Sequence, residues 1–465
     1  SVSFADGGAL HARPNFLFVY TDDQAPWSLG CYGNTYAHTP NLDRLSTESV
    51  MLTNSFVVTP VCSPSRASVI SSRYGTEVGV TDWISPKGRE YTRDESQLGL
   101  DPNLPTWVRD LSTNGYDTCL IGKWHLGTLD KFHPSHFGYR HFSGFREGGV
   151  TPQNPKLEID GVVKEVEGLA DDILAQLALD YLRNARATQP FLLSVHFRNP
   201  HAPWTPYNEK DAEAYAGKET PVPEPDFPDL DTERVKKSMH DYMVNITTVD
   251  RNVGLLLAEL ERSGVADNTI VVFTGDNGYN IGHHGVIHKG NGSWITNAVK
   301  GIPGGDPRLT RSNMFDNSLR VPTLIRWKQG LPSARRMART TTNLDWYKTL
   351  LALCGVSYDE SAILRGRDFS PLLRGTSIRW DDDLYAEYSQ HHYREADMRT
   401  YRTAEWKLTR DFRTEGKDEL YHLKSDPLER RNLIGDARCR DIQNRLSKAI
   451  EENMRRVNDP VLARI

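Results

Sequence analysis

Cysteine is scarce in this chain of 465 residues: only five are present, at positions 31, 62, 119, 354 and 439, and no two stand in CxxC spacing. This scatter indicates neither a disulfide framework nor a zinc site. Long apolar runs are also lacking, so no membrane-spanning helix is expected. Ser1 to Ala12 lack the basic and apolar regions of a signal peptide, so we expect that any leader has already been removed.

Basic residues are not in excess, because the net charge is −5, and nothing in the sequence indicates a nucleic-acid partner. The content of 38% hydrophobic and 25% charged residues is typical of a soluble globular protein. The length exceeds what one hydrophobic core usually supports. We therefore predict a large domain over residues 1–375 and a small one over residues 376–465.

Short apolar runs alternate with amphipathic stretches along the first part of the chain, which is typical of a large, mostly parallel α/β sheet flanked by helices. Apolar residues at helical spacing predict helices around residues 170–182 and 249–260. The predicted strands are Asn15 to Thr21, Asp117 to Gly122, Phe191 to Phe197, Thr269 to Thr274 and Val321 to Trp327.

Two other stretches are predicted to be surface loops, Pro200 to Asp231 and Lys289 to Ser312. Beyond Gly375 the pattern changes. Shorter alternating segments at Met398 to Asp411 and Glu419 to Leu423, followed by a charged helix from Asp436 to Arg456, predict a small antiparallel sheet with one helix.

Polar residues are concentrated directly after the predicted strands. Ligands of open α/β sheets bind outside the carboxyl ends of the strands, so these side chains are expected to meet in one crevice. The alternative is that they cap helices and turn loops. In chain order they are Asp22 and Asp23, Lys123 and His125, His201, and Asp276 and Asn277.

Three of these residues are aspartates and one is an asparagine. These four side chains offer only hard oxygen ligands. Such ligands suit calcium or magnesium rather than zinc or copper. Magnesium tends to keep several waters, whereas a crowded cage of protein oxygens favours the larger ion. The sequence therefore predicts one calcium ion held by Asp22, Asp23, Asp276 and Asn277.

A single cysteine stands at the predicted start of a helix in the segment VCSPSRASVISSR, which runs from Val61 to Arg73. Pro64 is suited to the first turn of that helix, and helix N-termini attract anions. Taken alone, a cysteine before a helix is more often structural than catalytic. Here its neighbours favour a catalytic role, because Cys62, Ser63, Pro64, Ser65 and Arg66 together form a specific motif.

This motif resembles the Cys-x-Pro-Ser-Arg signature of the type I sulfatases of the alkaline phosphatase superfamily. The resemblance covers residues 15–330, and the segment ELYHLKSDPLERRNL resembles the family's small closing domain. Ser72 and Gly75 depart from the usual pattern at positions without a catalytic role. The other matching blocks, in the family's order, are FVYTDDQ, TPNLDRL, GYDTCLIGKWHLG, NPHAPW, FTGDNGYNIGHHG and SLRVP.

The resemblance implies a sulfatase in which a formylglycine-generating enzyme oxidises Cys62 to formylglycine, whose hydrate attacks the sulfur of a sulfate ester beside the calcium ion, with residue 62 among the metal ligands. It also implies that Arg66 and Lys123 hold the hydrate and that His125 takes a proton from it. His201 and Lys289 would contact the sulfate and help to protonate the leaving alkoxide. A periplasmic or secreted location is expected.

The substrate is expected to be a sulfated small molecule or glycan, most plausibly a carbohydrate, because aromatic faces beside polar groups suit a sugar ring. The insertion from Lys289 to Asn313 is expected to shape the pocket. Candidate contacts with the substrate are His284, Trp204, Trp294, His391, His392, Tyr393 and Arg394.

Two other functions fit the same residues. One is a phosphate or phosphonate monoester hydrolase, or a sulfamidase, of the same superfamily. The other is a binding protein that has kept the scaffold and lost turnover. Retention of the complete polar set argues against the second alternative.

Overall fold

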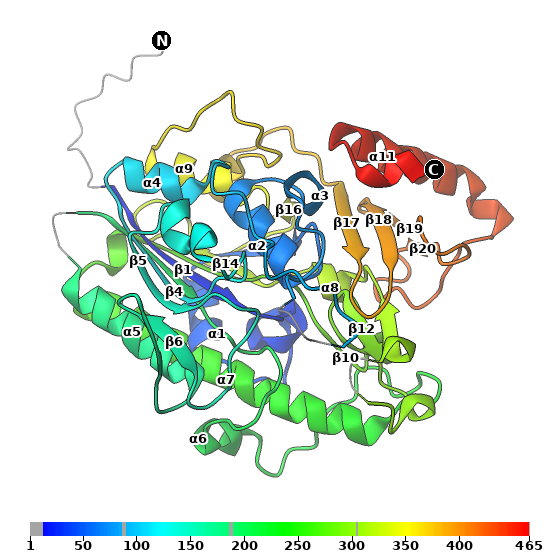
Figure 1. Cartoon of the computed structure of the whole chain (residues 1–465), viewed down its shortest axis with the longest axis horizontal. Helices are drawn as coiled ribbons and strands as arrows, with labels where there is room; N and C mark the ends of the chain where they lie inside the picture. The colour runs from blue at the N-terminus through cyan, green and yellow to red at the C-terminus, as the bar shows by residue number, and fades with distance from the viewer. Residues whose placement is uncertain (1–12, 86–89, 186–188, 304–305, 465) are drawn as a thin grey trace.

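The centre of the molecule is a ten-stranded mixed sheet in the order β15-β2-β14-β9-β1-β8-β4-β5-β6-β7 (Figure 1). The computed structural model describes residues 13–85, 90–185, 189–303 and 306–464, so the segment Ser1 to Ala12 lies outside the described residues. The strands are β15 (Arg335–Met337), β2 (Val50–Leu52), β14 (Thr323–Arg326), β9 (Thr269–Gly275), β1 (Asn15–Thr21), β8 (Phe191–His196), β4 (Asp117–Lys123), β5 (His141–Phe145), β6 (Lys156–Ile159) and β7 (Val162–Glu165).

The middle of this sheet is parallel, and so is the pair β15 and β2 at one edge, whereas the remaining pairings are antiparallel. The strands β9, β1, β8, β4 and β5 run in one direction, which confirms four of the five predicted strands as a parallel unit. The fifth differs: β14 is antiparallel to both of its neighbours. It begins at Thr323 rather than Val321, since Pro322 has no backbone N–H to contribute to the ladder.

Helices cover both faces of the sheet, as the sequence predicts. Alternate residues of a strand point to opposite faces. On one face Leu17 and Val19 pack with α5 (Ala170–Asn184) and α7 (Thr232–Arg262). On the other face Phe16 and Phe18 pack with helices that include α4 (Trp107–Thr113) and α9 (Trp346–Cys354). The predicted helix at 249–260 is the second half of the long α7.

The two predicted surface loops contain regular structure. The first includes the short helix α6 (Glu209–Ala212). The second includes β12 (Asn291–Trp294) and β13 (Thr310–Ser312), which form an antiparallel sheet with β10 (Asn280–Ile281) and β11 (Val286–His288). These strands have two to four residues, too short to show a period of two in the sequence.

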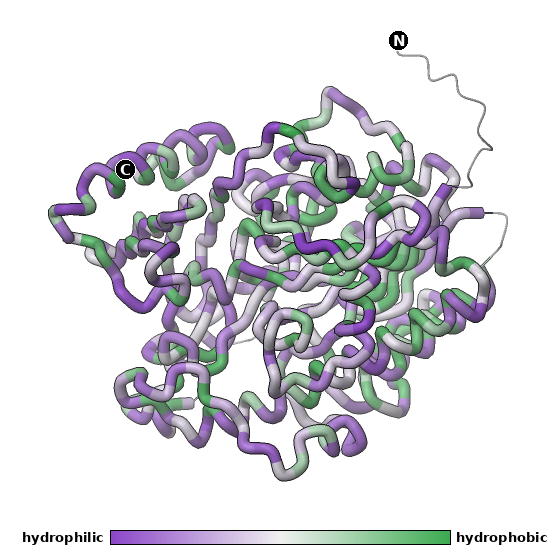
Figure 2. Tube along the Cα trace, turned by 180° about the vertical axis from the view of Figure 1, so that it is seen from behind, coloured by the Kyte–Doolittle hydropathy of each residue, from purple (hydrophilic) through white to green (hydrophobic). Residues whose placement is uncertain are grey.

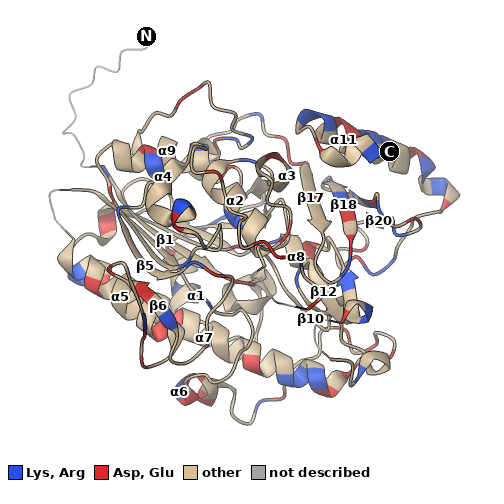
Figure 3. Cartoon of the chain, in the orientation of Figure 1, with Lys and Arg blue, Asp and Glu red and all other residues tan. Residues whose placement is uncertain are grey.

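The C-terminal part is an antiparallel sheet of β17 (Leu384–Gln390), β18 (Ala396–Arg402), β19 (Trp406–Asp411) and β20 (Glu419–His422), with α11 (Arg440–Arg456) across it. The outward side of α11 is hydrophilic (Figure 2) and carries interspersed charges of both signs (Figure 3). Apolar residues of this sheet share one cluster with Val58 and Val61, just before Cys62. The division at residue 375 stays a prediction.

Replacing Arg399 by leucine is expected to lower the free energy of unfolding by about 3 kcal/mol, because a buried charge then loses its partner. Arg399 and Asp459 are both fully buried, and Arg399 Nη2 donates to Asp459 Oδ1 at 2.9 Å. The matched control is Arg455→Leu on the exposed side of α11, where the ion pair with Glu451 is worth about 0.3–0.5 kcal/mol. Urea denaturation measures both, and equal effects would contradict the prediction.

Candidate active site

The carboxyl ends of β1 and β9 bring three aspartates together, as the sequence predicts. Asp276 N donates to Thr21 O at 2.9 Å, and Asp23 N donates to Asp276 Oδ1 at 3.1 Å. The chain turns sharply at Asp23, which has a φ of 67°. Asp22, Asp23 and Asp276 are all buried, and one oxygen of each lies within 4.8 Å of the others.

Buried carboxylates this close repel one another unless cations compensate. Burial acts to raise the pKa of Asp22, but Lys123 and the other neighbouring cations hold it well below its usual range. Burial and the charge of Asp22 raise the pKa of Asp276 to about 6. Asp276 is therefore the carboxylate whose ionised form would gain most from a further positive charge nearby.

An unsatisfied oxygen points to the same need. Among the described residues, Asn277 Oδ1 is buried and has no hydrogen-bond partner, while Asn277 Nδ2 donates to Asp23 Oδ1 at 2.8 Å. A buried carbonyl oxygen without a donor is costly. Together with the three aspartates it forms an all-oxygen donor set, which fits a hard divalent cation such as calcium.

Cys62 is the first residue of α2 (Cys62–Ser71) and lies directly beside this cluster. Its Sγ is 3.5 Å from Asp22 Oδ1 and 2.7 Å from Lys289 Nζ. Burial, reinforced by Asp22, raises the pKa of the Cys62 thiol to about 12. Since the thiolate is the nucleophilic form of cysteine, this raised pKa disfavours unmodified Cys62 as a nucleophile at neutral pH.

Three buried cations surround the residue 62 side chain. Arg66, one turn along α2, donates from Nε to Asp276 Oδ2 at 3.0 Å and forms an ion pair with the same oxygen, with Nη2 at 2.9 Å. Lys123 Nζ donates to Asp22 Oδ2 at 2.5 Å, and Lys289 Nζ pairs with Asp23. Each cation is thus fixed by one of the carboxylates, and Lys289 also faces the sulfur atom.

Two histidines complete the cluster, and their hydrogen bonds assign their protons. His125 Nε2 is 3.1 Å from the carbonyl of Ile84, which can only accept, so Nε2 carries the hydrogen and Nδ1 the lone pair. Burial and then Lys123 keep the pKa of His125 well below its usual range. His201 Nδ1 likewise faces the carbonyl of Ala202 at 2.5 Å, and burial lowers the pKa of His201 to about 4.

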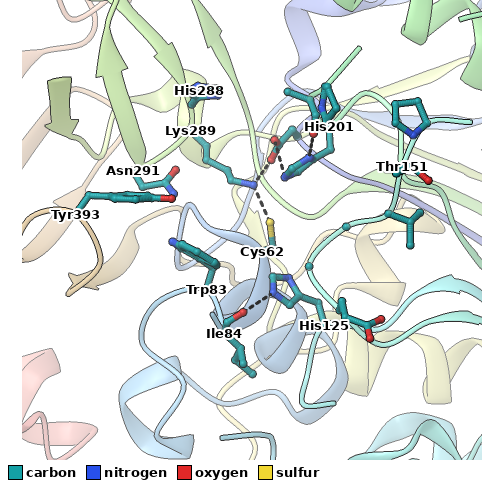
Figure 4. A pocket seen from close by; sticks show the side chains of 18 residues that line it. Cys62, Trp83, Ile84, His125, Thr151, His201, His288, Lys289, Asn291 and Tyr393 are labelled. Atoms are coloured by element: carbon teal, nitrogen blue, oxygen red, sulfur yellow. Dashed lines mark hydrogen bonds and ion pairs between the residues drawn. The ribbon is translucent and has the colours of Figure 1, made fainter. Parts of the chain in front are cut away.

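A cavity of about 650 Å³ opens above Cys62 (Figure 4). Its walls include Asp23, His125, His201 and Lys289, whereas Asp22, Arg66, Lys123, Asp276 and Asn277 lie buried behind them. The outer part is lined by residues that the sequence did not single out, apart from Tyr393. These are Trp83, Glu147, Thr151, His288 and Asn291. They come from irregular segments and strand ends. Asn291 lies in the insertion from Lys289 to Asn313 that was expected to shape the pocket, and the position of His288 beside Lys289 could have indicated a second residue.

Most of the predicted substrate contacts lie away from this cavity. Trp204 packs against Tyr242 and Tyr279 and donates from Nε1 to Pro200 O at 2.8 Å. The ring of His284 stacks on Phe315 with the centroids 3.7 Å apart. Both side chains therefore serve packing.

The remaining predicted contacts do not line the active-site cavity either, apart from Tyr393. Trp294 and Arg394 line a second cavity of about 410 Å³. His391 and His392 pair with Glu95 at 2.7 and 3.0 Å and do not line the active-site cavity.

Carboxylates, cations and histidines around a helix N-terminus, at the carboxyl ends of a parallel sheet, define an α/β enzyme whose pocket is built for an anionic ester. The chain belongs to the sulfatase family, in the alkaline phosphatase superfamily: the family model described as Sulfatase matches residues 14–356. A second model, described as N-sulphoglucosamine sulphohydrolase, C-terminal, matches residues 308–456. The chain is thus a sulfuric ester hydrolase.

Several proteins are similar to it over nearly its whole length. An N-acetylglucosamine-6-O-sulfatase of Bacteroides thetaiotaomicron is 25% identical, covering 96% of this chain and 87% of the relative. An ulvan-active sulfatase of Formosa agariphila is 25% identical, covering 97% and 83%. A solved structure in complex with its substrate D-glucosamine-2-N,6-O-disulfate shares the fold, with a TM-score of 0.80 at 23% identity and coverage of 97% and 99%. Over the described ranges, no helix is long and apolar enough to span a membrane.

Proposed function

We propose that this sulfatase hydrolyses a sulfate monoester on a carbohydrate, releasing the alcohol and inorganic sulfate. The observation that carries the proposal is the position of Cys62, whose Sγ contacts both Asp22 and Lys289 at the floor of the cavity. The similarity to sulfatases named for N-acetylglucosamine and ulvan supports a carbohydrate substrate.

Asp22, Asp23, Asp276 and Asn277 would hold a calcium ion, with residue 62 as a further ligand. The unsatisfied Asn277 Oδ1 and the raised pKa of Asp276 support this assignment. Bound there, the ion would supply positive charge to the sulfate oxygens and to the attacking oxygen.

Residue 62 is proposed to act as formylglycine, made by a formylglycine-generating enzyme, and its hydrate would supply the nucleophilic oxygen. The Sγ atom of Cys62 stands in for that oxygen in this structure. Lys289 Nζ, 2.7 Å from Sγ, holds a positive charge beside it. Neutral His125, with the lone pair on Nδ1, is suited to accept a proton inside the cavity.

The developing charge on the leaving oxygen needs compensation as the bond to sulfur breaks. Arg66 and Lys123 each form an ion pair with a carboxylate, which fixes their positions around residue 62. His201 and Lys289 line the cavity, and we assign them to contact the sulfate and the leaving oxygen. We also propose a periplasmic or secreted location.

A sulfamidase, which cleaves nitrogen-bound sulfate, is the second candidate. It is favoured by the match of residues 308–456 to the N-sulphoglucosamine sulphohydrolase C-terminal model. Both reactions transfer a sulfuryl group, so the cluster around Cys62 suits either one. The two reactions differ in the atom that leaves, oxygen or nitrogen, which is bonded directly to the sulfur.

The substrate is testable by free-sulfate release from defined sulfated mono- and disaccharides, with calcium present and with residue 62 shown by mass spectrometry to be converted. We expect release from at least one carbohydrate O-sulfate and from an aryl sulfate. Matched phosphate and phosphonate esters of one leaving group, and an N-sulfated glucosamine, separate the alternatives. Absence of sulfate release from every O-sulfate would overturn the proposal.

A further inference from the structure

Two neighbouring aromatic side chains, Trp83 and Tyr393, line the active-site cavity (Figure 4). The rings of Trp83 and Tyr393 have centroids 6.1 Å apart and planes inclined by 31°. Trp83 follows the short helix α3 (Gly75–Val78) of the large domain, whereas Tyr393 lies in the turn between β17 and β18 of the C-terminal sheet. The pair therefore joins two parts of the chain that are far apart in sequence.

Tyr393 is held in an uncommon backbone conformation. Its φ is 62°, which a bulky L-residue adopts only when its surroundings enforce it. Tyr393 N donates to Tyr91 O at 2.7 Å, and Arg394 N donates to His392 O at 2.7 Å. Backbone strain of this kind is retained at sites where a side chain has to be aimed.

A buried polar network fixes the segments on both sides of the pair. His392 is fully buried, and its ring lies 4.6 Å from the ring of Trp83. Its Nε2 contacts Glu95 Oε2 at 3.0 Å, while His391 Nε2 contacts Glu95 Oε1 at 2.7 Å. Glu95 thus clamps both histidines onto the loop that carries Trp83.

Asp82 forms the other half of this network. Its Oδ2 accepts the backbone N–H groups of His391 and His392 at 3.0 and 3.2 Å. Its Oδ1 accepts from Tyr388 Oη and from Trp83 N at 3.0 and 2.9 Å. Asp82, His391 and His392 could in principle hold a metal ion. Each oxygen of Asp82 already accepts two hydrogen bonds. The cluster therefore functions as a hydrogen-bond network that holds the two segments together.

We propose that Trp83 and Tyr393 form the surface on which the sugar ring of the substrate stacks, and that Asp82, Glu95, His391 and His392 are positioning residues for it. This inference rests on the proposed carbohydrate sulfatase activity. It adds to that activity a site for the ring that bears the sulfate.

The chemistry of a pyranose matches this wall. Such a ring has C–H faces, which pack on aromatic rings, and hydroxyl edges, which need hydrogen-bond partners. Asn291 and Glu147 also line the cavity and provide polar groups for the hydroxyls. With the sulfate beside Cys62 at the floor, the sugar ring occupies the outer part of the cavity. A pyranose fits this combination of faces and edges better than an all-carbon ring system does.

The test uses binding, so that it does not depend on turnover. Cys62→Ala protein is titrated with N-acetylglucosamine 6-sulfate and with galactose 6-sulfate by calorimetry. Adding Trp83→Ala or Tyr393→Ala is expected to weaken the tighter of the two sugars about tenfold, whereas Trp83→Phe keeps most of the affinity because a ring remains. Trp406→Phe, in the C-terminal sheet and outside the cavity, is the matched control.

The positioning role is tested in the active enzyme with Glu95→Gln, in which one of the two carboxylate oxygens that contact the histidines is replaced by an amide NH₂ group. We expect KM for the sugar sulfate to rise about tenfold, with kcat nearly unchanged and the melting temperature within a few degrees of the parent. A merely structural role would instead lower kcat for the sugar sulfate. It would also change KM for an aryl sulfate as much as KM for the sugar sulfate.

The inference is overturned if neither sugar binds the Cys62→Ala protein, or if removing both aromatic rings leaves the affinity unchanged. Failure of the proposed function has a different signature. In that case the parent enzyme would bind these sugars but release no sulfate from them.

Discussion

Replacing Cys62 by alanine is expected to reduce the kcat for sulfate release by at least about 10⁴-fold, as removal of a catalytic nucleophile does. The reason is structural as well as chemical. Burial and Asp22 raise the pKa of the thiol to about 12, so the sulfur itself contributes no nucleophile at neutral pH. Activity would depend on oxidation of residue 62, and sulfate-release assays measure the loss.

The matched control is Cys354→Ala, a buried cysteine at the end of α9 that does not line the active-site cavity. It should retain the parent kcat. A peptide mass at residue 62 tells whether the parent sample carries the aldehyde. An active sample whose residue 62 is entirely thiol would contradict the proposed chemistry, and so would an active Cys62→Ala protein.

Calcium is expected to raise the free energy of unfolding of metal-depleted protein by about 4 kcal/mol when its concentration is 1,000 times the Kd. Asp22, Asp23 and Asp276 present oxygens within 4.8 Å of one another, and a divalent cation held there would relieve their repulsion and would give the unpartnered Asn277 Oδ1 a positive charge to contact. Chelation should accordingly abolish sulfate release, and calcium should restore it. Thermal unfolding with and without calcium measures the stabilisation.

Asn277→Ala is expected to lose much of this calcium response, because it removes the oxygen that has no protein donor. Asn280→Ala is the matched control. Asn280 is also buried with an unpartnered Oδ1, but its Nδ2 is anchored in the antiparallel sheet by His288 O and Ser318 Oγ. If calcium stabilises both variants and the parent by the same amount, Asn277 is not a ligand of the ion.

The parts of the site that follow strands were predictable from the sequence. Asp22, Lys123 and Asp276 each stand at or just beyond the carboxyl end of a buried run of apolar residues, and the parallel sheet brings such ends to one edge. The motif around Cys62 indicated a helix start for a similarly local reason. The convergence of the residues that follow the strands could thus be predicted without knowing how the side chains pack.

The outer pocket was not predictable in the same way. Trp204 and His284 carry the right chemistry, yet their rings are used in packing, while Trp83 was overlooked. The position of an irregular loop depends on the residues it packs against, and these are distant in sequence. Trp83 reaches the cavity only because Asp82 binds the backbone of His391 and His392, some 310 residues further along the chain.

The amino-acid sequence by itself determined the α/β class, the family motif and the inner cluster, because local periodicity and strand ends are encoded by neighbouring residues. Tertiary structure alone decided the antiparallel flanks of the sheet, the protonation of His125 through the Ile84 carbonyl, and the aromatic wall of Trp83 and Tyr393. Those features arise from contacts between segments with no common local pattern, so only the packed chain specifies them.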